Sequence, residues 1–101
     1  MTELIIVARV SAAPEDADEL ERRLRLLSDA SKTEPGCLEY EVFRSSERPE
    51  QFVSIEKYAD ADAFAAHRAA EHFQSIGVAQ VVPMLASRDI QVYPADARIT
   101  S

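Results

Sequence analysis

The strongest constraint on the fold is a run of strand-forming residues near the N-terminus, from Leu4 to Val10. Apart from Arg9, this run is apolar on both faces of the strand that it predicts. An apolar face left in water is costly, because burial contributes about 25 cal/mol for each Å². We therefore expect this strand to lie in a sheet that is covered on both faces.

The next segment has helical spacing. Pro14 suits the first turn of a helix, and the acidic pair Glu15 and Asp16 complements the helix dipole. Apolar side chains then recur every three or four residues from Ala17 to about Lys32. This pattern predicts an amphipathic helix packed on the sheet.

A turn at Pro35-Gly36 separates this helix from two strands. Residues 38–43 alternate in character and predict the first of them, and the Pro49-containing segment 45–50 predicts a hairpin connection. The second, from Phe52 to Tyr58, should present four side chains on one face, namely Phe52, Ser54, Glu56 and Tyr58.

Asp60 can cap a second helical region, which continues to Ile76 as one helix or two short ones. Because of Gly77 and Pro83, the sequence does not determine where this helical region ends. The segment from Ser87 to Tyr93 predicts the last strand. The tail from residue 94 is polar, and we expect it to be loose.

The order of elements is β-α-β-β-α-β, which defines an α+β fold of the ferredoxin-like type, with a four-stranded antiparallel sheet and helices on one face. The 101 residues indicate a single domain, with a core of about residues 3–93 and a tail at 94–101. A second copy of the chain is the natural cover for the other face. We therefore expect a homodimer whose two sheets face each other.

Composition and charge limit the classes of partner that we expect this chain to bind. A formal net charge of −7 repels phosphate backbones and argues against nucleic acid. No apolar run has the length that a bilayer span or a signal peptide requires, so no membrane partner is expected. Cys37 is the only cysteine, which excludes an intrachain disulfide and indicates a structural role. Together these features favour the cytoplasm.

Five stretches in succession resemble the antibiotic biosynthesis monooxygenase (ABM) domain, and the likeness covers nearly the whole chain. They are Glu34 to Tyr40, Pro49 to Phe52, Glu56 to Tyr58, Ala63 to His67 and Glu71 to Phe73. The chain is similar to the small quinol monooxygenases of that family. The resemblance implies a dimeric α+β barrel with a pocket between helices and sheet. It also implies oxidation of quinols, anthrones or related polyphenols with O₂, without flavin or metal.

The two histidines are the first candidates for catalysis. His67 shares a helix face with Phe64 near small alanines, where imidazole can take a phenolic proton. The family pattern also places a histidine here; the alternative is a structural histidine at the seam between helix and sheet. His72 is a second polar pocket residue or a helix-junction residue. On a continuous helix the two lie roughly 140° apart, unlike the i, i+4 pair of a zinc helix, so no metal site is expected.

Glu56 is the second catalytic candidate, because a buried carboxylate in mid-strand needs a partner. It could orient His67 or bind a substrate hydroxyl, and the alternative is an ion pair with Arg9 or Arg44. An aromatic-binding pocket is expected to use Tyr40, Phe52, Tyr58 and Phe64. The alternative for these rings is ordinary core and dimer interface.

These features favour a cofactor-independent monooxygenase that oxidises a quinol or related electron-rich aromatic with O₂. Gly36 and Gly77 are the only glycines, so no glycine-rich phosphate loop or nucleophile elbow exists. Haem-degrading relatives use an asparagine and a tryptophan, and this chain has neither. Two alternatives stay open: a non-catalytic dimer that binds a small metabolite or serves in a stress response, and an isomerase of phosphorylated autoinducer-2 breakdown. The isomerase would need a phosphate site, for which Arg9, Arg44 and Arg68 are candidates.

Overall fold

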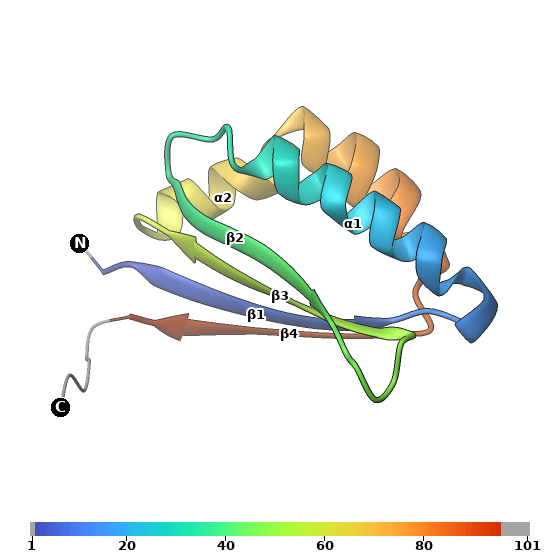
Figure 1. Cartoon of the computed structure of the whole chain (residues 1–101). Helices are drawn as coiled ribbons and strands as arrows, with labels where there is room; N and C mark the ends of the chain where they lie inside the picture. The colour runs from blue at the N-terminus through green and yellow to red at the C-terminus, as the bar shows by residue number, and fades with distance from the viewer. Residues whose placement is uncertain (1, 96–101) are drawn as a thin grey trace, which may run out of the picture.

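The computed structural model describes residues 2–95, which form one antiparallel sheet with helices on a single face (Figure 1). The sheet has the strand order β2-β3-β1-β4, and the predicted ferredoxin-like β-α-β-β-α-β topology is confirmed. Its strands are β1 (Leu4–Ser11), β2 (Cys37–Arg44), β3 (Gln51–Tyr58) and β4 (Ser87–Pro94).

The helical layer has two long pieces. A short 3₁₀ turn, η1 (Pro14–Asp16), leads into α1 (Ala17–Ser31). The second helical region consists of α2 (Ala61–Ala69), the π-helix η2 (Phe73–Val81) and the 3₁₀ turn η3 (Val82–Met84). In Figure 1 the C-terminal part of this region runs beside α1 above the sheet.

The apolar stripe of α1 explains how this layer is attached. Leu20, Leu24 and Leu27 are buried against the sheet and η2, as their helical spacing predicts. On the side of β2, the Arg44 guanidinium lies 2.8 Å from an Asp18 carboxylate oxygen and 2.9 Å from one of Glu21. These ion pairs connect α1 to the sheet at its β2 edge.

A break divides the second helical region. The Asp60 side chain accepts a hydrogen bond from the Ala63 backbone N–H at 2.8 Å, so the predicted cap at the start of α2 is confirmed. Ala70 then takes an extended conformation (φ −65°, ψ 147°), which stops the helix before η2 begins. The region is therefore two helices with different axes, and helical spacing does not carry across Ala70.

The turn before β2 lies unusually close to α2. A Cβ added at Gly36 would collide with the Ala63 side chain, so only glycine fits there. The Gly36 carbonyl also accepts a hydrogen bond from the Ala59 N–H at 2.9 Å. This contact fixes the α1–β2 turn against the start of α2.

Alternation along β3 is as predicted. Phe52, Ser54, Glu56 and Tyr58 face the helices and are buried, while Val53 and Ile55 face the other way and are half-buried. The prediction that the loose tail begins at Pro94 was wrong, because Pro94 belongs to β4. The N–H of the next residue, Ala95, donates a hydrogen bond to the Glu3 carbonyl. Residues 96–101 lie outside the described part of the chain.

The face of the sheet opposite the helices carries an apolar patch. It consists of Ile5, Val7, Phe43, Val53 and Ile55, and none of the helices described between residues 2 and 95 covers it (Figure 1). Val7 and Ile55 are direct cross-strand partners near its centre. Within the same range, no helix has both the length and the apolar character needed to cross a membrane.

We expect the wild-type protein to sediment at micromolar concentration as a dimer of the 11.2 kDa chain. Ile55→Lys should shift it toward the monomer, because it removes about 1.5–3 kcal/mol of burial for each side chain. Leu26→Lys is the matched control, since Leu26 is 42% exposed on α1, in the helical layer. A wild-type monomer under these conditions would contradict the two-sheet dimer.

Candidate active site

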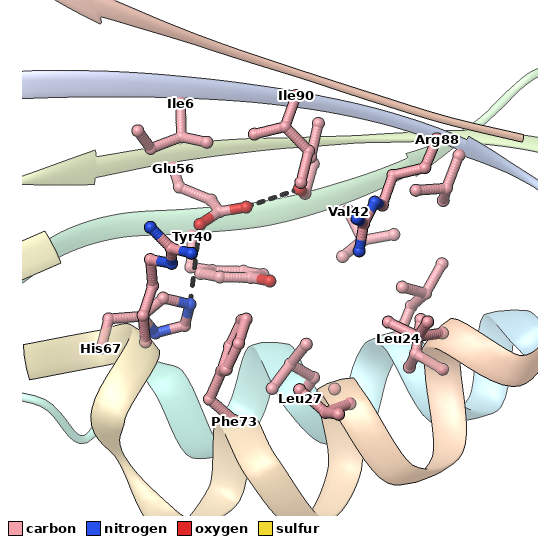
Figure 2. Close-up of a pocket in the computed structure, with 18 of the residues that line it drawn as sticks. Ile6, Leu24, Leu27, Tyr40, Val42, Glu56, His67, Phe73, Arg88 and Ile90 are labelled. Carbon is pink, nitrogen blue, oxygen red and sulfur yellow. Dashed lines mark hydrogen bonds and ion pairs between the residues drawn. The ribbon is translucent and has the colours of Figure 1, made fainter. Parts of the chain in front are cut away.

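A cavity of about 440 Å³ lies between the helical layer and the sheet (Figure 2). Most of its wall is apolar and comes from α1, η2 and the inner face of the sheet, including Leu24, Leu27, Val42, Phe73 and Val81. The inner side chains of the edge strand β4 are only partly covered, with Ile90 50% and Val92 49% exposed. The cavity therefore has an apolar body and a partly open side along β4.

Glu56 forms one half of the polar end of this cavity. It projects from the middle of β3 and is 5% exposed. The hydroxyls of Ser54 and Tyr58, two residues away on the same strand face, each donate to its carboxylate at 2.7 Å. Burial raises the pKa of Glu56 above its ordinary value, and the two hydroxyl hydrogen bonds lower it in part.

His67 forms the other half of the polar end of the cavity. It is 2% exposed in α2, and its ring centroid lies 5.0 Å from that of Phe73 and 5.1 Å from that of Tyr58. Its Nε2 atom is 3.9 Å from Glu56 Oε1, on the side of the sheet (Figure 2). That separation is too long for a hydrogen bond, so Glu56 does not hold the imidazole in place.

Glu34 is the partner of His67 that the sequence analysis missed. It lies in the turn between α1 and β2, and its Oε2 atom is 2.9 Å from His67 Nδ1. The interaction joins residues 33 positions apart, and no spacing rule links a turn residue to a helix so far along the chain. The only available signal was that Glu34 opens the first stretch resembling the ABM domain.

His72 contacts the same Glu34 oxygen through its Nε2 atom. The expectation that the two histidines point roughly 140° apart was wrong, because it assumed a continuous helix across Ala70. The break at Ala70 changes the direction of the chain, so that the His72 side chain lies near His67, with 6.3 Å between the two ring centroids. His72 does not line the cavity.

The aromatic candidates divide into two groups. Tyr40, Phe52 and Phe64 line the cavity, and Phe52 also belongs to the apolar core beside Leu24. Tyr58 is fully buried behind the cavity wall, where its hydroxyl donates a hydrogen bond to Glu56. Burial raises the pKa of both tyrosines above the ordinary value, and the nearby Glu56 charge raises it further.

The arginines are placed differently from one another. The alternative of a Glu56 ion pair with Arg9 or Arg44 is wrong: Arg44 binds Asp18 and Glu21, and Arg9 pairs in register with Val53 on the outer face. Arg68 lines the cavity, with its guanidinium 5.8 Å from the Phe64 ring centroid. Arg88 of β4, which the sequence analysis did not consider, also lines it (Figure 2).

An apolar cavity with a buried imidazole and a buried carboxyl at one end defines a small domain that can bind a small molecule and exchange a proton with it. Residues 4–77 match the model of the antibiotic biosynthesis monooxygenase family, and the chain belongs to that family. The family resemblance found in the sequence is thus confirmed. No functionally curated protein matches the chain.

Solved structures of similar proteins share the whole fold. A Pseudomonas aeruginosa protein is 32% identical with a TM-score of 0.87, over 96% of this chain and 97% of its own. A Caulobacter crescentus protein, described as a candidate antibiotic biosynthesis monooxygenase, is 30% identical with a TM-score of 0.86, over 95% and 92%. A Deinococcus radiodurans protein with the same description is 26% identical with a TM-score of 0.86, over 97% of each chain.

Within residues 2–95, Glu34, His67 and His72 form a group that could hold a metal ion, since their ligand atoms lie within 4.8 Å of one another. Two imidazoles and a carboxylate form a ligand set that zinc and related divalent ions accept. Here the nitrogens contact the Glu34 oxygen directly, and a metal would have to displace those contacts and any protons in them.

We expect the purified protein to be colourless and free of stoichiometric metal, because both imidazoles already contact Glu34 Oε2 without an ion. Elemental analysis by mass spectrometry and an absorption spectrum test this. One transition metal per chain, lost on His72→Ala, would contradict the expectation, as would a flavin spectrum.

The raised pKa of Glu56 predicts that its ionisation opposes folding as the pH increases through that pKa. Glu56→Gln can keep both hydroxyl contacts without a charge. We expect this variant to gain stability relative to wild type as the pH rises above the ordinary carboxyl value of 4.5, and to show no such gain below it. Each tenfold increase in proton affinity corresponds to about 1.4 kcal/mol.

Urea unfolding of both proteins between about pH 4 and about pH 8 measures the difference, with the exposed Glu39→Gln as control. A difference that does not depend on pH would show that Glu56 is not protonated preferentially in the folded state.

Proposed function

We propose that this protein is a cofactor-independent monooxygenase that oxidises a quinol, or a related electron-rich aromatic, with O₂. Membership of the antibiotic biosynthesis monooxygenase family supports the reaction class. The observation that carries the proposal is the position of His67 Nε2, which lies beside an apolar, aromatic-walled cavity and has no hydrogen-bond partner among residues 2–95.

The shape and lining of the cavity suit a flat aromatic substrate. Its volume of about 440 Å³ lies within the range of small-molecule pockets. The rings of Tyr40, Phe64 and Phe73 contribute to the wall, with aliphatic side chains completing it. A hydroxyl of such a substrate would enter the polar end, between His67 Nε2 and Glu56 Oε1.

The proposed first step is proton transfer. A phenol has a pKa near ~10, so little of it is anionic at neutral pH without a base. His67 would accept the phenolic proton at Nε2, and Glu56 in its neutral form would donate a hydrogen bond to the same oxygen. Exclusion of water by the apolar wall would leave the resulting aryloxide poorly solvated and electron-rich.

The redox steps then involve only substrate and O₂. The aryloxide gives one electron to O₂, and the resulting aryloxyl radical combines with superoxide at a ring carbon to form a carbon–oxygen bond. Cleavage of the O–O bond leaves one oxygen atom on the oxidised product and releases the other as water, with protons supplied by the substrate through His67. The protein contributes deprotonation, desolvation and confinement.

A second candidate is the binding or isomerisation of a phosphorylated metabolite. One observation favours it: Arg68 and Arg88 line the cavity, and neither forms an ion pair within residues 2–95. Oxygen consumption with a panel of reduced quinones separates the two. Consumption supports the monooxygenase, whereas its absence together with thermal stabilisation by a sugar phosphate supports the second candidate.

We expect His67→Ala to lower the turnover of a quinol substrate by at least roughly tenfold, the cautious edge of the ~10²–10⁴-fold contribution of a positioned base. The measurement is oxygen uptake beside the melting temperature, with Leu26→Ala on the exposed side of α1 as control. Unchanged turnover in a folded His67→Ala protein would remove this residue from the mechanism. Loss of folding would instead favour the structural role.

A further inference from the structure

We infer that Glu34 is a positioning residue, which holds the His67 imidazole as the Nδ1–H tautomer and so leaves the Nε2 lone pair free at the cavity. The effect that we expect Glu34 to have on turnover rests on the proposed function. The tautomer does not depend on that function and can be measured directly.

The first argument comes from two contacts to one oxygen. Glu34 Oε2 lies 2.9 Å from His67 Nδ1 and also contacts His72 Nε2. A carboxyl group protonated on Oε2 would donate to one of these nitrogens and accept from the other. An ionised carboxylate accepts from both, and each neutral imidazole carries one N–H to donate. We take the ionised form, in which both contacts are N–H donations to the carboxylate and the proton of His67 lies on Nδ1.

The second argument is that no other hydrogen bond within residues 2–95 favours the alternative tautomer of His67. His67 Nε2 is 3.9 Å from Glu56, beyond hydrogen-bond reach, and Glu56 is already bonded by Ser54 and Tyr58. Nδ1 is thus the ring nitrogen of His67 that has a hydrogen-bond partner in the described part of the chain. The hydrogen bond at one nitrogen of an imidazole decides which nitrogen carries the proton.

The third argument is that the backbone holds Glu34 firmly. Its N–H donates to the Ser31 carbonyl at the end of α1 at 3.1 Å, and its carbonyl accepts from the Cys37 N–H at the start of β2, also at 3.1 Å. The close contact of Gly36 with Ala63 fixes the same turn against α2, the helix that carries His67. Glu34 and His67 are therefore presented to each other by packed elements.

Within residues 2–95, no lysine or arginine forms an ion pair with Glu34. Its partners there are the two imidazoles, and its Oε1 atom is buried without a hydrogen bond. A carboxylate in this position stabilises the imidazolium that forms when Nε2 takes a proton. Glu34 would thus support His67 as a base through position and charge, without touching the substrate.

The test combines Glu34→Gln with nuclear magnetic resonance of ¹⁵N-labelled histidine. At a pH at which imidazole is neutral, we expect wild-type His67 to show a protonated Nδ1 and an unprotonated Nε2. In Glu34→Gln the carboxamide can donate to Nδ1, so the Nε2–H tautomer should become populated. Quinol turnover should fall by about 10-fold or more, within the ~10⁴-fold loss known for a comparable change beside a catalytic histidine.

Two variants provide the controls. Glu39→Gln removes an exposed carboxylate of β2 and should change neither tautomer nor turnover. His72→Gln identifies which histidine signals belong to His67. If Glu34→Gln does not fold, Glu34→Asp replaces it, and the expected Nδ1–H signal should persist there with a weaker hydrogen bond.

Two results would overturn the inference: a wild-type His67 with its proton on Nε2, or an unchanged tautomer and unchanged turnover in folded Glu34→Gln. Failure of the proposed function looks different. A wild-type protein that shows the Nδ1–H tautomer but consumes no O₂ with any quinol would keep the assignment of Glu34 and reject the monooxygenase.

Discussion

Burial of ionisable side chains beside an apolar cavity is the constraint on which the rest of this structure depends. Each such group needs a hydrogen-bond partner, because an unpaired one costs several kcal/mol. Glu56 is satisfied within its own strand by Ser54 and Tyr58, and His67 by Glu34 from a distant turn. The polar end of the cavity is therefore built from two separate networks that face each other across a gap of 3.9 Å.

These networks have different origins in the chain. The one around Glu56 follows from the period of a β-strand, since residues two apart share a face. The one around Glu34 depends on three tertiary features: the anchored turn after α1, the contact of Gly36 with α2, and the extended residue Ala70. A pocket histidine is thus supported by parts of the chain that have no local relation to it.

Family membership and the site together give a consistent chemical picture. Members of one fold carry out different reactions, so the fold alone does not identify a substrate. Here the aromatic wall and the buried imidazole support the proposed electron-rich aromatic substrate, and the pair of cavity arginines supports the second candidate, a phosphorylated metabolite. The two differ in whether the polar end or the arginines bind the reacting group.

The sequence by itself determined the fold and the strand faces, and it identified part of the cavity wall, namely Tyr40, Phe52 and Phe64. Alternation in β3 and the apolar spacing of α1 are local patterns, and each reports directly which side chains face the core. Residue types also marked His67 and Glu56 as candidates. Only the tertiary structure decided how they are partnered. Glu34 is 33 residues from His67, and His72 reaches it because the helix breaks at Ala70. Contacts of this kind depend on how separate elements pack against one another, and periodicity within an element carries no information about that packing.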